Sequence, residues 1–83
     1  MNVQVRYFAS VREALGLAHE EVQTTASDVA GLLNELRARG GAYAEVLAVG
    51  RPVRVAVNQV MGSPSTPLQA GAEIGFFPPV TGG

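Results

Sequence analysis

The sequence predicts one α+β domain in which a single main helix covers one face of a mixed sheet of four or five strands. Three observations predict this class. Several short stretches alternate apolar and polar residues, one longer stretch has helical periodicity, and the elements follow the order strand, strand, helix, strand, short strand, strand. One helix can bury one face of such a sheet and leave the other face in water. With 83 residues, the chain has room for one hydrophobic core.

The first two strands are predicted near the start of the chain. Residues 2–8 alternate, and the core face of this strand would hold Val3, Val5 and Tyr7. Phe8 falls on the opposite face. Residues 20–25 are polar with β-branched members, which is typical of an edge strand, so we expect them to pair with the first strand.

Two helices are predicted from capping residues and spacing. Ser10 and Glu13 have the spacing of a capping box, which predicts a short helix that ends near Gly16. Ser27 is expected to cap the main helix, with Asp28 at its positive end. The apolar positions of this helix recur at helical spacing: Val29, Leu32, Leu33 and Leu36.

The second half of the chain is predicted to supply the remaining strands. Residues 42–50 are apolar and short and are compatible with a helical turn. Alternation predicts a strand over residues 53–57, a turn at residues 58–59 and a brief return strand at residues 60–61. The last strand is predicted over residues 73–77.

The face opposite the core is a candidate partner site. The period of two places Phe8 and Phe77 on that face, and the two rings would form an apolar patch with Met61 if the first and last strands are neighbours. Exposed apolar patches on small domains tend to mark partner sites, and aromatic side chains dominate the energetics of such interfaces. The alternative is that a loop shields one of the rings.

Two further residues, one charged and one titratable, are candidates for a functional role. Arg12, on the short helix, would pair with an acidic group of a partner or stand as an ordinary solvated arginine. His19 is expected to face solvent, and without a Ser, Cys or Asp constellation around it we assign it no catalytic role.

The composition excludes several classes of function. The net charge of −1 provides no basic field for nucleic acid, and all six basic residues are arginines, so no lysine can form a Schiff base. Without cysteine the chain has no thiol of its own, and thiol or persulfide chemistry must come from a partner. No metal site is expected. No apolar run is long enough to cross a membrane and no secretory signal is visible, so we expect a cytoplasmic location.

The last six residues, 78–83, form a tail that the sequence separates from the domain of residues 1–77. Pro78 and Pro79 restrict φ and favour an extended segment. Val80 and Thr81 would contact the walls of a partner's channel, and the adjacent Gly82 and Gly83 lack the Cβ atoms that would jam it. The alternative is a frayed chain end.

The tail sequence Phe-Phe-Pro-Pro-Val-Thr-Gly-Gly closely resembles that of the small subunits of molybdopterin synthase, which are sulfur carriers of the ubiquitin-like β-grasp fold. Other parts of the chain share the likeness: Tyr7, Phe8, Ala9, Val11, Arg12, Glu13, Val57, Asn58, Gln59, Pro67, Leu68, Gly71 and Glu73. Ala72 departs from the pattern, because such proteins often carry Asp there in a turn. The departure concerns the turn and leaves the chemistry untouched.

The resemblance implies that Gly83 carries sulfur as a C-terminal thiocarboxylate. An adenylating partner related to ubiquitin-activating enzymes would use ATP to activate Gly83, and a persulfide donor would supply the sulfur. A large subunit would bind the cyclic pyranopterin precursor and receive two sulfurs for the dithiolene of molybdopterin, in a hetero-oligomer of the heterotetramer type. The partner interface would include Phe8, Arg12, Met61 and Phe77, and the chain itself would bind no cofactor.

Two alternatives share the Gly-Gly tail. The chain could carry sulfur for the thiazole of thiamine or for tRNA thiolation, or it could be a ubiquitin-like modifier joined to lysines of other proteins. The Phe-Phe-Pro-Pro-Val-Thr stretch favours molybdopterin synthase.

Overall fold

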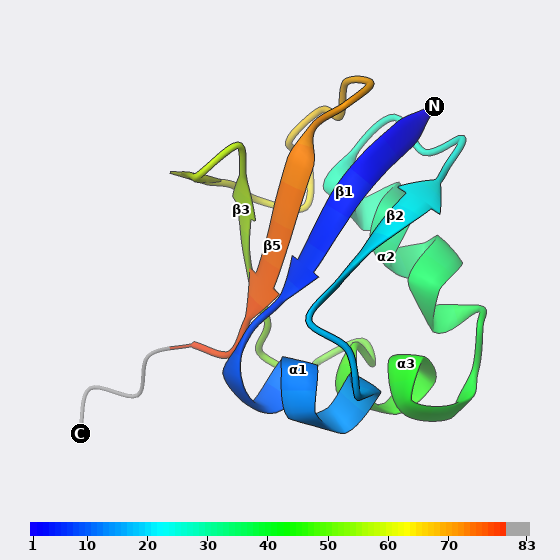
Figure 1. Cartoon of the computed structure of the whole chain (residues 1–83), viewed down its shortest axis with the longest axis vertical. Helices are drawn as coiled ribbons and strands as arrows, with labels where there is room; N and C mark the ends of the chain where they lie inside the picture. Colours follow the sequence, from blue (N-terminus) through cyan, green and yellow to red (C-terminus); the bar gives the residue numbers. More distant parts are fainter. Residues whose placement is uncertain (80–83) are drawn as a thin grey trace.

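The computed structural model describes residues 1–79 of the chain. Five strands form one sheet in the order β2-β1-β5-β3-β4 (Figure 1). The strands are β1 (Asn2–Tyr7), β2 (His19–Gln23), β3 (Arg54–Val57), β4 (Val60–Met61) and β5 (Glu73–Phe77). The helices are α1 (Ala9–Leu15), α2 (Val29–Arg37) and α3 (Gly41–Val46). The predicted α+β class and mixed sheet are confirmed, and residues 42–50 prove to contain most of a third helix.

The sheet is mixed because β1 and β5 run parallel while every other neighbouring pair is antiparallel. The first and last strands are therefore neighbours, as the predicted patch requires. The hairpin between β3 and β4 turns at Asn58 and Gln59, which both have positive φ, 51° and 69°. Two positive φ values in a two-residue loop match the twist of the flanking strands. The Asn58 side-chain oxygen also accepts a hydrogen bond from the Glu73 amide at 2.9 Å.

The core lies between one face of the sheet and α2. Alternation in β1 holds as predicted: its three core residues are buried, and Phe8 is 45% exposed. From α2 the fully buried side chains are Val29, Leu32 and Leu36. Figure 1 shows α1 and α3 gathered at the end of the sheet where β1 and β5 finish, so these two short helices close the core beside the start of the tail.

The start of α1 differs from the prediction. Ser10 is not its cap, because the helix already begins at Ala9 and Phe8 occupies the cap position without a side-chain hydrogen bond. The carbonyl oxygen of Phe8 instead accepts the amides of Val11 and Arg12, at 3.1 and 3.3 Å. The turn is tight enough to give Ala9 a φ of 51°.

The predicted cap of α2 was wrong by one residue. Asp28, and not Ser27, has the extended backbone of a cap, and its side-chain oxygen accepts the Gly31 amide at 2.9 Å. Within residues 1–79, no helix is long and apolar enough to cross a membrane.

Candidate functional site

Phe8 and Phe77 meet on the sheet face opposite the core. Their ring centroids are 6.4 Å apart with an interplanar angle of 79°, an edge-to-face arrangement. The Phe8 ring also lies over Gly75 of β5: a Cβ added at Gly75 would come within 3.0 Å of the ring carbon Cε2. Gly75 therefore leaves the space that the Phe8 ring occupies. Sequence analysis missed this role, although a glycine inside a strand is a signal of close approach.

Met61 belongs to the same face by register. It pairs with Ala56 of β3, and Ala56 pairs in turn with Gly75 of β5. Residues directly opposite one another in a ladder share a face. Met61 is 56% exposed and lies at the far edge from β1. The apolar patch, defined as Phe8, Phe77 and Met61, thus has its aromatic pair in contact and its methionine across the sheet.

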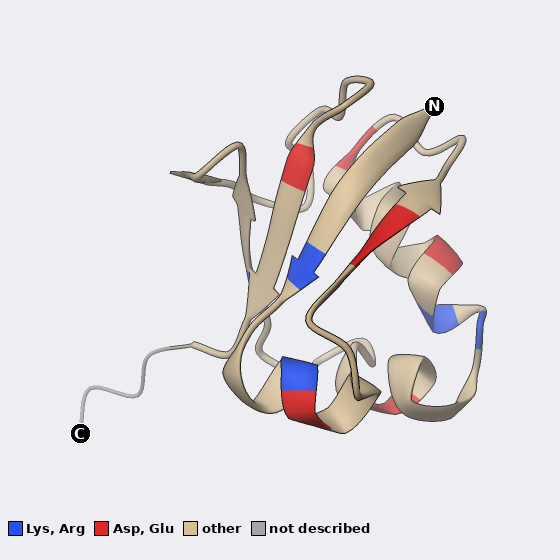
Figure 2. Ribbon diagram, viewed as in Figure 1, with Lys and Arg blue, Asp and Glu red and all other residues tan. Residues whose placement is uncertain are grey.

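Few charged residues lie around the patch, and one of them, the exposed Arg54, stands directly opposite Phe77 in the ladder between β3 and β5. Arg6 and Glu73 form an exposed ion pair with a distance of 3.5 Å between Nε and the carboxylate oxygen. Arg12 is exposed on α1 beside Glu13 (Figure 2), and within residues 1–79 its side chain has no ion-pair partner. The structure therefore places Arg12 one helical turn from Phe8, available to an outside group.

The tail begins where β5 ends. Pro78 and Pro79 are half-buried and line a groove of about 310 Å³ together with residues of α1, α3 and the segment before β3. The other four tail residues predicted to act, Val80, Thr81, Gly82 and Gly83, lie outside the described residues.

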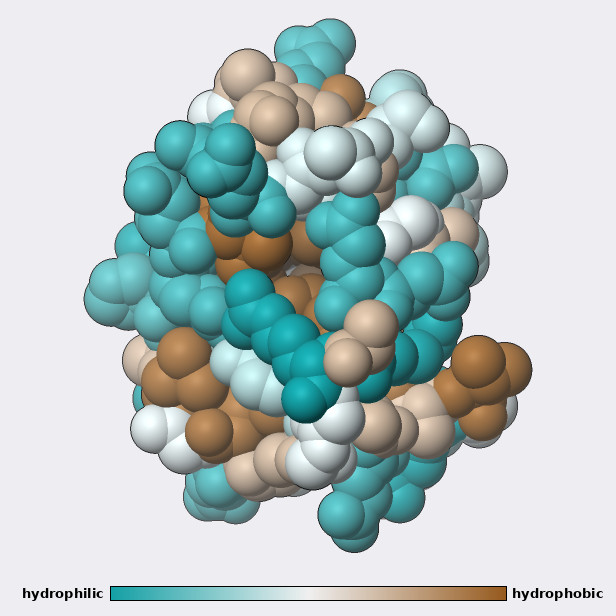
Figure 3. All heavy atoms as spheres, turned by 90° about the vertical axis from the view of Figure 1, so that its right-hand side faces the viewer, coloured by the Kyte–Doolittle hydropathy of each residue, from teal (hydrophilic) through white to brown (hydrophobic). Residues whose placement is uncertain are grey.

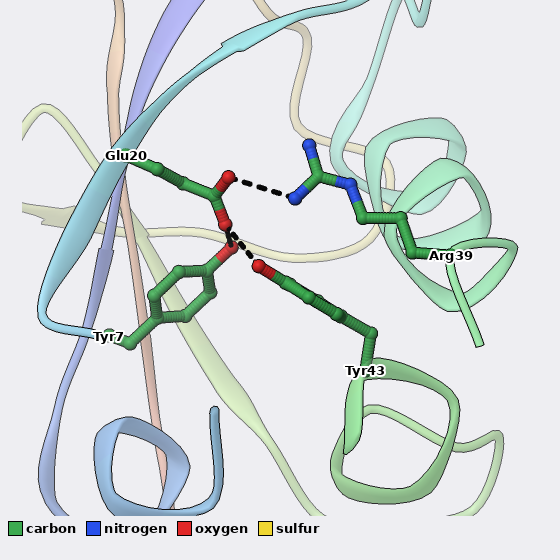
Figure 4. Close-up of polar contacts among 4 residues, drawn as sticks. All are labelled: Tyr7, Glu20, Arg39 and Tyr43. Carbon is green, nitrogen blue, oxygen red and sulfur yellow. Dashed lines mark hydrogen bonds and ion pairs between the residues drawn. The ribbon is translucent and has the colours of Figure 1, made fainter. Parts of the chain in front are cut away.

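A polar network on the side of β2, α2 and α3 had no counterpart in the sequence analysis (Figure 4). One oxygen of Glu20, on β2, accepts the hydroxyls of Tyr7 and Tyr43 at 2.8 and 2.7 Å, and the other accepts an Arg39 amino group at 2.8 Å. The Arg39 guanidinium also lies over the Tyr43 ring, 4.9 Å from its centroid. This side of the molecule is mainly hydrophilic (Figure 3). We interpret the network as a support for the fold, since it joins β1, β2, α3 and the connection between α2 and α3, where Arg39 lies.

The network shifts the ionisation of its members. Desolvation by burial tends to raise the pKa of Glu20, but the hydrogen bonds from Arg39, Tyr43 and Tyr7 outweigh it and hold this pKa below its ordinary value. Burial, and then the hydrogen bond to Glu20, raise the pKa of Tyr7 and of Tyr43. The hydrogen bond to Glu20 raises the pKa of Arg39. These shifts favour a charged Glu20 and Arg39 and an uncharged Tyr7 and Tyr43.

The described residues lack the ingredients of a metal centre. Among residues 1–79 no three His, Asp or Glu side chains lie close enough together to hold an ion. What the described residues offer is a folded domain with an aromatic pair, a groove and a proline pair at one end of its sheet, and with Met61 at the far edge.

Comparisons with known proteins agree along the whole chain. A sequence profile of the ThiS family matches residues 5–83. The molybdopterin synthase sulfur carrier subunit of Escherichia coli strain K12 is 40% identical over 81 residues, which cover 98% of this chain and 99% of the relative. A solved complex of subunits 1 and 2 of the molybdopterin-converting factor from Helicobacter pylori contains a chain that is 28% identical, with a TM-score of 0.68 and coverage of 100% of both chains. Small archaeal modifier protein 1 of Haloferax volcanii, 22% identical with a TM-score of 0.74 over 95% of this chain and 98% of its own, shares the fold.

Proposed function

The chain belongs to the ThiS family, as a sulfur carrier subunit of the molybdopterin synthase type, and from this premise we propose that Gly83 carries the sulfur. Its fold is the ubiquitin-like β-grasp that the resemblance implied. The observation that carries the proposal is a likeness that runs along the whole sequence and through the Gly-Gly pair. The domain, residues 1–77, serves as the scaffold, and residues 78–83 serve as the delivery arm.

The chemistry begins with activation of the Gly83 carboxylate. A carboxylate is anionic and a poor electrophile, so an adenylating partner first joins it to AMP from ATP and releases pyrophosphate. A persulfide of the sulfur donor then attacks the acyl carbon and expels AMP. Cleavage of the resulting S–S bond by a thiol leaves the thiocarboxylate on Gly83. The thiol and the persulfide belong to partners, because this chain has no cysteine.

The tail sequence suits delivery into an enclosed site. Gly82 and Gly83 have no Cβ, so their backbone can pass through a narrow channel. Pro78 and Pro79 have a fixed φ, which lowers the conformational entropy that the arm loses when it binds. Val80 and Thr81 contact the channel walls. Two thiocarboxylate sulfurs delivered in this way convert the cyclic pyranopterin precursor, bound to the large subunit, into the dithiolene of molybdopterin.

The apolar patch and Arg12 form the docking surface for the large subunit. The contact between Phe8 and Phe77, next to the start of the tail, supports this assignment. The complex formed by the two subunits of the Helicobacter pylori relative supports a large subunit as the partner. The assembly is a heterotetramer, and we place it in the cytoplasm, where ATP is available to the adenylating partner.

Intact mass spectrometry tests the proposal directly. Incubation of the purified chain with the adenylating enzyme of the same organism, ATP and a persulfide source should raise its mass by about 16 Da, the difference between sulfur and oxygen. A chain that lacks Gly83 serves as the control and should gain nothing. No mass gain on the intact chain would contradict the mechanism. Binding to a thiazole synthase or a tRNA-modifying enzyme in place of the large subunit would assign the carrier to another pathway.

A further inference from the structure

The groove beside Pro78 and Pro79 lies at the start of the tail, and none of the residues of the apolar patch line it. Val11 of α1 and Val46 of α3 lie within it and are 2% and 7% exposed, so they form its apolar floor. Val53 is half-buried at its wall. With a volume of about 310 Å³, this tail groove is at the lower end of the size range of ligand pockets.

Arg51 gives the tail groove a charge. It is exposed, and it lines both the groove and an adjoining hollow of about 240 Å³ that also contains Glu45. Within the described part of the chain, its guanidinium makes no side-chain hydrogen bond and no ion pair, unlike that of Arg39, which binds Glu20. A positive charge therefore stands beside an apolar floor, and the Glu45 carboxylate, which lines the adjoining hollow and not the groove, forms no ion pair with it.

The wall formed by α3 is held in place from behind. Tyr43 of α3 donates its hydroxyl to Glu20 at 2.7 Å, and the Arg37 side chain donates to the carbonyl oxygen of Leu47 at the end of the helix. These contacts hold a helix of six residues in place, so the part of the tail groove that Val46 forms is positioned by the chain itself.

We propose that the tail groove receives an apolar side chain and a neighbouring carboxylate from the rim of the channel in the large subunit, with the carboxylate pairing with Arg51. The inference rests on the proposed function. Under that function Gly83 is the reacting terminus, and the four residues from 80 to 83 span at most about 14 Å when extended. A terminus that must reach reacting atoms inside a channel therefore brings the channel rim against the start of the tail.

A rim that closes around the tail covers the tail groove as well as the apolar patch. Covering Arg51 removes water from its guanidinium, which is unfavourable unless the partner supplies an opposite charge. Filling the valine floor with an apolar side chain removes that surface from water and is favourable. These two requirements specify an occupant that is apolar with an adjacent acidic group.

Calorimetric titration against the large subunit from the same organism tests the proposal. Ser10→Tyr places a ring in the tail groove from an exposed position of α1 and should weaken binding at least tenfold, about 1.4 kcal/mol. Its matched control is Ser65→Tyr, an exposed serine that does not line the groove, which should bind as the wild type does. Arg51→Met should weaken binding roughly tenfold and Arg51→Glu further. Arg51→Met should also reduce the salt dependence between about 50 and 300 mM.

The outcomes separate this inference from the function on which it rests. If the wild type gains sulfur and binds the large subunit while Ser10→Tyr and both Arg51 variants bind equally well, the tail groove is overturned and the carrier function stands. If the wild type does not bind the large subunit at all, both fail. Far-UV circular dichroism and thermal melting establish whether each variant is folded. If Ser10→Tyr does not fold, the Arg51 variants, whose side chains are exposed, decide the test.

Discussion

Asp28 is the residue that fixes the start of α2. Its side chain satisfies an amide of the first turn that has no partner within the helix. We predict that Asp28→Ala lowers the free energy of unfolding by about 1 kcal/mol, as the loss of an N-cap does. Ser27→Ala, one residue earlier, should change it by less than about 0.5 kcal/mol. Urea unfolding of both variants measures the difference, and equal effects would show that the cap is not specific to Asp28.

Gly75 controls the position of the Phe8 ring. A methyl group at Gly75 would meet Cε2 of Phe8 at 3.0 Å, and because that ring is half-exposed it can move aside. We predict that Gly75→Ala keeps the fold but weakens binding of the large subunit by about 1 kcal/mol, since Phe8 loses its contact with Phe77. Phe77→Ala should weaken it by more than about 1 kcal/mol.

A double-mutant cycle separates the effect on Phe8 from a direct effect of the methyl group. In a Phe8→Ala background, Gly75→Ala should cause no further loss of affinity, because the ring that it displaces is absent. An undiminished loss in that background would place the methyl group itself against the partner.

Single residues were predictable from the sequence where one interaction dominates. The alternation of Val3, Val5 and Tyr7 against Phe8 was read correctly, because only one face of this sheet is buried. The choice between Ser27 and Asp28 could not be made, since both are good caps and the path of the incoming chain decides between them. Gly75 was overlooked because its partner lies on another strand, far away in the sequence.

At the scale of elements, the Glu20 network holds β1, β2 and α3 together. Glu20→Gln keeps one acceptor oxygen but replaces the other by an NH2 group and removes the negative charge, so the side chain can no longer accept from both tyrosines and pair with Arg39 at once. We predict that Glu20→Gln lowers the free energy of unfolding by about 1 to 2 kcal/mol, or roughly 5 to 10 °C in the melting temperature. Glu21→Gln is the matched control, because the Glu21 carboxylate has one exposed hydrogen bond, from Gln4, and should tolerate the change. Equal melting temperatures for the two variants would contradict a supporting role for Glu20.

The same network makes stability depend on pH at both extremes. The pKa of Glu20 is lowered in the fold, so its stabilising contribution is present above the carboxylate's ordinary pKa and is lost as the pH falls through the folded value. The pKa values of Tyr7 and Tyr43 are raised, so their contribution is complete below the ordinary tyrosine pKa of about 10 and is lost as the pH rises above it.

Unfolding by urea from about pH 2 to pH 11 measures both limbs of this dependence. Glu20→Gln should flatten the acid limb, and Tyr43→Phe should reduce the alkaline one. An acid limb of unchanged slope in Glu20→Gln would assign the dependence to other carboxylates.

Elements were predictable to the extent that local pattern controls them. The bounds of α2, β1, β3 and β5 were predicted nearly correctly because their apolar periodicity matches the one buried face, whereas β2 was predicted from its polar, β-branched composition as an edge strand. No decisive pattern marks α3 in the sequence. The helix has six residues, begins at a glycine and is held by Tyr43 and Leu47 through contacts with distant elements. The tail groove could not be predicted, since its lining comes from four separate segments.

At the scale of the whole molecule, the features assigned to partners meet at one end. The aromatic pair, the tail groove and the start of the tail all lie where β1 and β5 finish, and α1 and α3 stand beside them (Figure 1). The Glu20 network lies on the mainly hydrophilic side of β2, α2 and α3 (Figure 3). The network and the features at the tail thus lie on different surfaces and are linked through α3, whose Tyr43 belongs to the network and whose Val46 lines the tail groove.

This separation predicts that residues 80–83, the outer part of the tail, can be removed without loss of the fold. Every buried apolar side chain of the described core lies between Val3 and Phe76. A chain ending at Pro79 should therefore melt within about 2 °C of the full chain, yet gain no sulfur. A chain ending at Phe76 is the control and should melt clearly lower, because it loses Phe77 and its pairing with Arg54 in the sheet. A fall of more than about 5 °C for the chain ending at Pro79 would mean that the tail is part of the folded domain and not an arm attached to it.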